Sequence, residues 1–272
     1  MASVITARRV AAESVGQSAA NSASSGGRYL ANGIGGLPSV QFAPNNVDDG
    51  YLSAFAMGTQ FGIQGDAGWT QIFVVRLITT YAGSPTARPI FGGLGNGYTF
   101  GGMAGLEIEN TGQDSARFDV SGGNSTDVVI DPPNSFSQFV NRDVIITVTH
   151  RGNTGQSMLN TTSIFINGNA PGEGTLMGNT LGSTGSGATT TRNLSNEPIS
   201  LGTTFAQGYV GFDGLIAEVI VYDGALADAE RREVELALGR KYGIPGIPEP
   251  KSLILSCLGL MGAMSSVGRR RF

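Results

Sequence analysis

Glu107 and Glu109 are the residues of this 272-residue chain whose types and spacing come nearest to a catalytic arrangement. Side chains two positions apart on a β-strand share a face and lie about 6.6 Å from each other. Hydrolysis of a glycosidic bond needs two carboxylates that are about 5 to 9.5 Å apart. The spacing of the two glutamates is therefore compatible with an enzyme that acts on glycans.

The other reactive side chains form no recognisable catalytic or metal-binding set. His150 is the only histidine and Cys257 the only cysteine, so the chain forms neither a histidine-based metal cluster nor an internal disulfide. No Gly-x-Ser-x-Gly motif accompanies His150, which we interpret as a strand-end residue. The glycines of residues 91–102 lack the Gly-Lys-Ser/Thr of a phosphate-binding loop and indicate a hairpin turn.

The composition indicates one β-rich domain with an acidic surface. The chain contains 42 glycines and only 14% charged residues, which is typical of many tight turns and few solvated helices. Residues 1–250 carry 13 basic and 21 acidic side chains, a net charge of −8. A surface of this sign cannot neutralise phosphates, so DNA and RNA are not expected as partners.

Eleven segments are predicted as strands because they are rich in Val, Ile, Thr and Phe and are bounded by Gly, Asn or Ser. They cover residues 37–42, 70–81, 88–93, 97–102, 105–110, 116–122, 127–130, 143–151, 162–168, 197–203 and 214–223. Many alternate apolar with polar residues, as half-buried antiparallel strands do. They predict an all-β, two-sheet antiparallel jelly-roll sandwich, in which residues 172–196 form a mobile loop.

One helix is expected after the last strand, over residues 226–241. Its acidic residues lie early, its Lys and Arg residues lie late, and Gly243 is placed to cap its C-terminus. Its apolar residues fall mostly on one stripe, which we expect to pack on the sandwich. The stripe consists of Leu226, Ala229, Val234, Leu236, Ala237, Leu238 and Tyr242.

The region around this helix carries a recognisable pattern: a Phe-x-Gly-x-Ile-Ala-Glu strand, a Tyr-Asp turn, a helix start and a closing Lys-Tyr-Gly. The matching residues are Phe212, Gly214, Ile216, Ala217, Glu218, Tyr222, Asp223, Leu226, Glu230, Lys241, Tyr242 and Gly243. The pattern resembles the C-terminal signature of laminin-G-like, concanavalin A-like domains of bacterial surface proteins. The resemblance covers residues 28–244, but the helix-capping serine of the signature is Ala227 here, which costs about 1 kcal/mol of capping.

The laminin-G-like resemblance implies ligand binding by loops at the rim of the sandwich, sometimes with Ca²⁺. Oxygen ligands for Ca²⁺, or partners for sugar hydroxyls, are available in one turn and in the tyrosine after it. This candidate rim consists of Asn45, Asn46, Asp48, Asp49 and Tyr51. A plain Asx-rich turn explains the same residues at least as well. Most of the aromatic side chains that a sugar site would use, Trp69 among them, are expected to serve the core.

Laminarinase-type glucanases share the expected fold and carry Glu-x-Asp-x-x-Glu, or the same motif with one bulged residue. Counted from Glu107, this chain has Glu109 in place of the Asp, and then Gly112 or Gln113 where the last carboxylate belongs. We therefore interpret the two glutamates as solvated strand residues and predict that the protein is not an enzyme.

The C-terminal tail contains an uncharged segment, 252–268, that would reach about 26 Å as a helix, close to a bilayer core of about 30 Å. A core-packing helix is the alternative, but the segment lacks a polar face. The order of a Pro-Glu-Pro motif, this apolar span and a basic cluster resembles the PEP-CTERM sorting signal of bacterial surface proteins. Its residues are Pro248, Glu249, Pro250, Arg269, Arg270 and Arg271, within residues 245–272. The resemblance implies processing by a membrane-embedded exosortase.

The arginines at the end of the tail would remain cytoplasmic, which predicts an exported body, first membrane-anchored and then at the cell surface or in the extracellular matrix. Residues 1–27 are low in complexity and contain no apolar run of a signal peptide, so we expect the true start to lie upstream. Three functions remain open: a noncatalytic binding or adhesion domain in extracellular polysaccharide, a divergent glycan-active enzyme, or a structural envelope protein.

Overall fold

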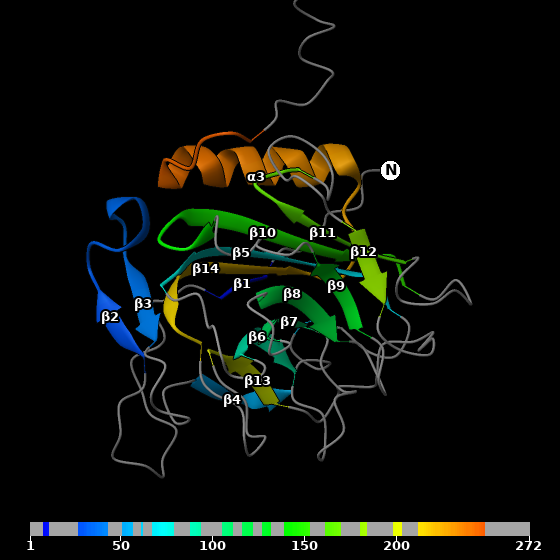
Figure 1. Ribbon diagram of the computed structural model, residues 1–272, viewed down its shortest axis with the longest axis horizontal. Helices are drawn as coiled ribbons and strands as arrows, with labels where there is room; N and C mark the ends of the chain where they lie inside the picture. Colours follow the sequence, from blue (N-terminus) through cyan, green and yellow to red (C-terminus); the bar gives the residue numbers. More distant parts are fainter. Residues whose placement is uncertain are drawn as a thin grey trace, which may run out of the picture.

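The computed structural model describes a two-sheet antiparallel β-sandwich with one helix packed on it, as predicted (Figure 1). The described residues are 8–10, 27–42, 51–56, 61, 67–78, 88–93, 105–110, 116–121, 127–131, 139–152, 161–169, 180–183, 198–202 and 212–247.

The two sheets are each built from seven strands, and all pairings between these strands are antiparallel. Sheet A contains, in spatial order, β11 (Thr162–Ile166), β10 (Asp143–His150), β5 (Trp69–Leu77), β14 (Gly214–Tyr222), β3 (Ser39–Phe42) and β2 (Arg28–Leu30), with β1 (Arg8–Val10) also paired to β14. Sheet B contains β12 (Thr180–Ser183), β9 (Asp127–Asp131), β8 (Ala116–Ser121), β7 (Gly105–Asn110), β6 (Arg88–Gly93), β13 (Pro198–Leu201) and β4 (Tyr51–Ala56).

The prediction missed four short strands, β1, β2, β4 and β12. β12 lies inside the expected loop 172–196, so the loop prediction is wrong at these residues, which pair with β9. β1 lies in the N-terminal segment that the sequence marked as low in complexity, and pairs with β14. The expected strand at 97–102 lies outside the described residues.

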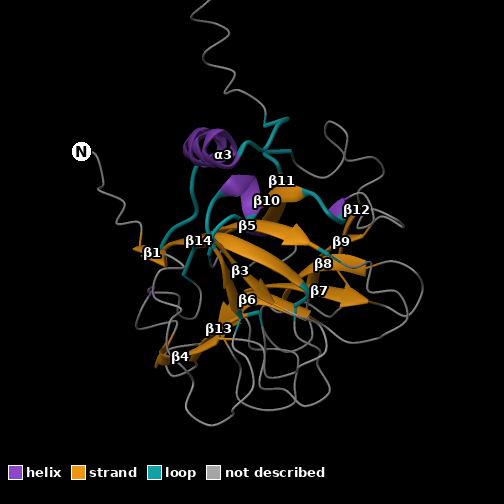
Figure 2. Ribbon diagram, turned by 90° about the vertical axis from the view of Figure 1, so that its left-hand side faces the viewer, coloured by secondary structure: helices purple, strands orange, loops and turns teal. Residues whose placement is uncertain are grey.

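Sheet A is buried on both faces because the helix α3 (Asp228–Tyr242) covers the face that points away from sheet B (Figure 2). On β5, Ile72 and Val74 belong to the cluster under the helix, and the alternate residues Phe73 and Val75 are buried on the opposite face. Polar residues on these strands, such as Thr70, are buried as well. The predicted half-buried alternation is therefore wrong for the middle of sheet A.

Helix α3 begins and ends within two residues of its predicted bounds. Ala227 provides no side-chain cap, but its N–H donates to Glu230 Oε2 at 3.1 Å, and Gly243 ends the helix in the left-handed conformation, with φ of 66°. The buried face differs from the predicted apolar stripe, because Ala229 and Ala237 are exposed.

Two charged residues of α3, Arg231 and Glu235, occupy the buried face instead. Their side chains are 1% and 0% exposed and form a two-point ion pair, with Arg231 Nη1 at 2.8 and 2.7 Å from the two carboxylate oxygens. The Arg231 guanidinium also lies 3.5 Å from the centroid of the Phe165 ring. Burial raises the pKa of Glu235, and the charge of Arg231 opposes that rise. Pairing at i and i+4 lets both charges enter the interior together.

Glu218 connects the middle of sheet A with the end of α3. A register shift between Ile216 and Glu218 marks a bulge in β14. The buried Glu218 carboxylate accepts hydrogen bonds from Lys241 Nζ at 2.7 Å and Tyr242 OH at 2.9 Å. The strand and the closing Lys-Tyr-Gly of the sequence signature therefore meet at one carboxylate.

Replacing Glu218 by alanine is expected to lower the free energy of unfolding by about 1 to 3 kcal/mol, because the hydrogen bonds from Tyr242 OH and Lys241 Nζ to its carboxylate are lost. Urea unfolding at pH 7 measures the change. Glu233→Ala, an exposed substitution on the same helix, is the matched control and should stay within about 0.5 kcal/mol of the wild type. Equal effects of the two substitutions would contradict a structural role for Glu218.

Candidate functional site

The residues of the candidate rim and of the sorting signal are not placed by the structure. Asn45, Asn46, Asp48 and Asp49 lie outside the described residues, as do Pro248, Glu249, Pro250, Arg269, Arg270 and Arg271. Tyr51 begins β4, where it pairs with Leu201 of β13.

The described part of the chain holds no helix long and apolar enough to cross a membrane. The predicted span 252–268 lies outside that part. Within the described ranges, His, Cys, Asp and Glu residues form no group of three that could hold a metal ion.

Glu107 and Glu109 lie two positions apart in β7, as expected. The register places Glu107 opposite Asp119 of β8 and Glu109 opposite Arg117. Asp119 is therefore the cross-strand partner of Glu107 in the backbone register of β7 and β8. A motif search within one strand cannot identify Asp119, because it lies on the neighbouring strand β8.

Trp69 and His150 are buried in the interior rather than displayed for a ligand. They face each other at the ends of β5 and β10, with ring centroids 5.5 Å apart. His150 Nδ1 lies 3.0 Å from the Thr162 hydroxyl. The interpretation of His150 as a strand-end residue is confirmed, and Trp69 serves the core.

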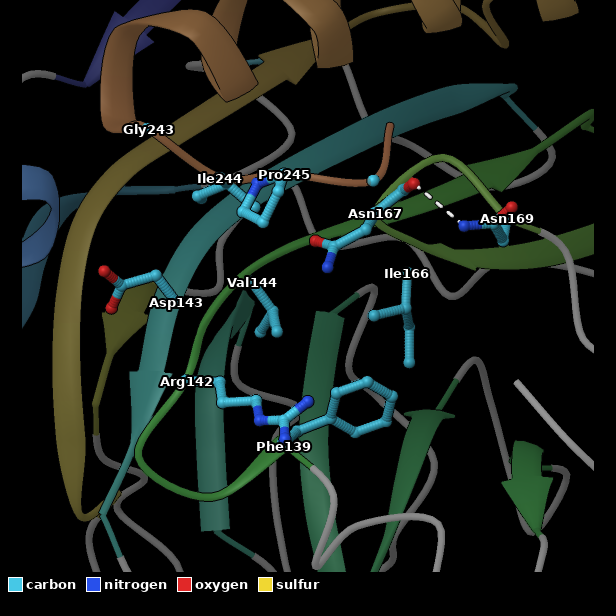
Figure 3. Close-up of a pocket in the computed structure, with 11 residues that line it drawn as sticks. Phe139, Arg142, Asp143, Val144, Ile166, Asn167, Asn169, Gly243, Ile244 and Pro245 are labelled. Carbon is cyan, nitrogen blue, oxygen red and sulfur yellow. Dashed lines mark hydrogen bonds between the residues drawn. The ribbon is translucent and has the colours of Figure 1, made fainter. Parts of the chain in front are cut away.

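One pocket of about 500 Å³ lies at the edge of sheet A, between the start of β10, the hairpin turn at Asn167 and Gly168 after β11, and the chain after α3 (Figure 3). We call it the hairpin pocket. Its size suits a small ligand. Its lining residues are Phe139, Arg142, Asp143, Val144, Ile166, Asn167, Asn169, Gly243, Ile244, Pro245 and Gly246.

The asparagine side of the hairpin pocket is formed by a tight turn. Asn167 and Gly168 both have positive φ, 49° and 79°, as the central residues of a two-residue hairpin turn require. Ile166 and Asn169 close the turn through two backbone hydrogen bonds of 3.0 and 3.1 Å. The backbone of the turn is therefore held in place by the sheet.

Hydrogen bonds with the protein fix how the two amide side chains present their polar atoms. Asn167 Oδ1 accepts from the Ile145 N–H at 2.9 Å, so its NH₂ group is left as a donor. Asn169 Nδ2 donates to the Asn167 carbonyl at 3.1 Å, which leaves its Oδ1 as an acceptor. Asn167 thus keeps a side-chain donor and Asn169 a side-chain acceptor, and both residues line the pocket.

The charged residues of the hairpin pocket lie at the start of β10. Asp143 is engaged by Arg76 of β5 through two contacts of 2.5 and 2.8 Å, and this hydrogen bonding raises the pKa of Arg76. Arg142 is exposed and has no ion-pair partner within the described part of the chain. Sequence reasoning missed this site, although the Asn-Gly pair at 167–168 is a signal for a hairpin turn.

The apolar surface of the pocket comes from Val144, Ile166, Ile244 and Phe139, which Figure 3 shows around the space between the asparagines and Arg142. These four side chains are 1 to 7% exposed and line the interior side of the pocket. The amides of Asn167 and Asn169 are able to hydrogen-bond the hydroxyl groups of a ligand there.

No protein-family model and no curated protein matches this chain. Among solved structures, the chain is similar to the binding domain of botulinum neurotoxin serotype D, with a TM-score of 0.50 and 12% identity over 79% of this chain and 45% of that one. It is also similar to domain 4 of AbnA, an extracellular arabinanase of Geobacillus stearothermophilus in complex with arabinotriose (TM-score 0.44, 14% identity, 76% and 80% covered). A third similar structure is Trypanosoma rangeli sialidase in complex with sialic acid. Its TM-score is 0.45 and its identity 16%, over 74% of this chain and 28% of that one.

The chain spans less than half the length of the neurotoxin and sialidase chains. Identities this low show the fold alone. The fold is a two-sheet antiparallel β-sandwich.

Proposed function

We propose that the chain is a noncatalytic binding or adhesion protein that recognises carbohydrate in an extracellular polysaccharide matrix. The observation that carries the proposal is the hairpin pocket, which is lined by the amide donor of Asn167 and the amide acceptor of Asn169. The fold itself does not identify a function.

Export and surface display belong to the same proposal. They are supported by the resemblance of residues 28–244 to laminin-G-like domains of bacterial surface proteins and by the resemblance of residues 245–272 to a PEP-CTERM signal. An exosortase-type enzyme would then release the body from its membrane anchor near Pro248–Pro250. Calcium at the candidate rim remains part of the hypothesis as an additional ligand.

A divergent glycan-active enzyme is the second candidate. The register that places Asp119 beside Glu107 favours it, because glycan hydrolysis requires more than one carboxylate at the reacting bond. A structural envelope protein without a ligand is the third.

We expect the full-length chain to bind polysaccharide without cleaving it. A glycan array with acidic and neutral polysaccharides measures binding, and a reducing-sugar assay on the same glycans measures cleavage. Release of reducing ends that disappears in Glu107→Gln, but persists in the control Glu233→Gln, would establish the enzyme instead. Absence of binding to every glycan would favour the structural role.

A further inference from the structure

We propose that the hairpin pocket binds an acidic sugar and that Arg142 holds the carboxylate of that sugar. This inference rests on the proposed carbohydrate-binding function and names its ligand class.

The charge balance of the pocket is the first argument. Arg76 compensates the Asp143 carboxylate through a two-point ion pair. Arg142 then contributes a positive charge that no described residue balances. A neutral sugar would leave this charge unused, whereas a carboxylate would be attracted to it.

The second argument is that the backbone of Arg142 is held by the sheet. The Arg142 N–H donates to the Phe139 carbonyl at 3.1 Å, and the N–H of Asn141 donates to the Leu77 carbonyl at 2.7 Å. Asn141 adopts the left-handed conformation, with φ of 58°, and Val140 forms a parallel bridge with Leu77. The turn therefore fixes the backbone position beside β10 from which the Arg142 side chain extends.

The third argument is that residues at different ends of the pocket suit different chemical groups of one sugar ring. Arg142 and Phe139 lie at one end in Figure 3, and Asn167 and Asn169 lie on the hairpin side. A planar guanidinium matches a carboxylate through two parallel hydrogen bonds, and the amides suit hydroxyl groups of the same ring. An acidic pyranose presents both kinds of group.

Calorimetry on the full-length chain tests the ligand class with three matched probes: oligogalacturonate, its methyl ester and a neutral galactan of the same length. We expect oligogalacturonate to bind and the two uncharged probes to bind at least tenfold more weakly. The affinity for oligogalacturonate should also fall as salt is raised, because the carboxylate contact is partly exposed to solvent. A sulfated galactan serves as a fourth probe that distinguishes a carboxylate site from a general anion site.

Substitutions locate the site. Arg142→Gln should weaken binding of oligogalacturonate by about tenfold to a hundredfold, the effect of losing charge-assisted hydrogen bonds. Arg151→Gln is the matched control, because Arg151 is an exposed arginine just beyond the other end of β10, and it should change affinity less than twofold. Asn167→Asp keeps the acceptor for the Ile145 N–H but replaces the donor with a charge, and should also weaken binding. Arg142→Lys, which keeps the charge without the guanidinium fork, should be intermediate.

The outcomes separate this inference from the proposed function. Equal binding of charged and neutral probes, or unchanged affinity in Arg142→Gln and Asn167→Asp, would overturn the acidic-sugar site and leave carbohydrate binding intact. Stronger binding of the sulfated probe would overturn the carboxylate assignment. Failure of every glycan to bind would overturn both proposals. If Arg142→Gln does not fold, Arg142→Lys and Asn167→Asp decide the question.

Discussion

Replacing Arg231 by methionine is expected to lower the free energy of unfolding by about 3 to 5 kcal/mol, which is a large part of the stability of a typical domain. The substitution leaves the Glu235 carboxylate buried beneath α3 without its ion-pair partner. Urea unfolding followed by circular dichroism measures the loss.

The loss should be larger at pH 8 than at pH 5. Burial already raises the pKa of Glu235, and removal of Arg231 removes a charge that opposes this rise. An acid whose pKa is raised in the folded state loses stability as the pH rises from its unfolded pKa to its folded pKa. At lower pH the Glu235 carboxyl can protonate, which relieves the unpaired buried charge.

The double variant Arg231→Met/Glu235→Leu is the control for this pair. It removes both charges and should recover most of the lost stability, because apolar residues of similar volume often replace a buried ion pair without loss. A double variant as unstable as Arg231→Met alone would show that the packing of Arg231 on Phe165 matters more than charge.

Gly35→Ala is expected to destabilise the fold by about 2 to 5 kcal/mol, from left-handed backbone strain and overpacking together. Gly35 belongs to the 3-10 turn Ile34–Gly36 and has φ of 59°, and an added Cβ would overlap the carbonyl group of Tyr242 at the end of α3. Thermal unfolding monitored by circular dichroism checks the expected fall in Tm.

Gly36→Ala separates the cost of backbone strain from the cost of overpacking. Gly36 also has positive φ, 74°, but an added Cβ would meet no atom within 4 Å. It should therefore cost only the backbone term, about 1 to 2 kcal/mol. Equal losses at positions 35 and 36 would mean that the contact with Tyr242 contributes nothing.

The predicted bounds of β6 and β7 match the structure at both ends, although each strand contains only one β-branched residue. β10 and β14 contain runs of Val, Ile and Thr, and their bounds match the prediction within one residue. β4 was missed because Tyr51–Ala56 contains alanine and serine and no β-branched residue. Its pairing partner, β13, lies almost 150 positions away, so only tertiary structure identifies it.

The burial of α3 could not be read from its residues. Arg231 and Glu235 at i and i+4 look like an exposed surface pair, and periodicity assigned the interior to alanines instead. In the structure the two side chains pair with each other in the interior, and the Arg231 guanidinium lies over the Phe165 ring of β11.

The hairpin pocket could not be predicted from the sequence either. Its turn at Asn167 is a local signal, but Arg142 lies 25 positions earlier and Ile244 lies 77 positions later. Asparagine, arginine and isoleucine at such separations carry no motif. Their convergence depends on the register of β10 with β11 and on where the chain leaves α3.

The central place of β14 in sheet A has a consequence for biosynthesis. β14 pairs with β5, β3 and β1, which precede it by well over one hundred residues, and α3 follows it directly. Such distant pairings close large loops and make folding slow. A ribosome must therefore translate nearly the whole body before sheet A can close, and until then the nascent chain exposes β5 and β10 to chaperones.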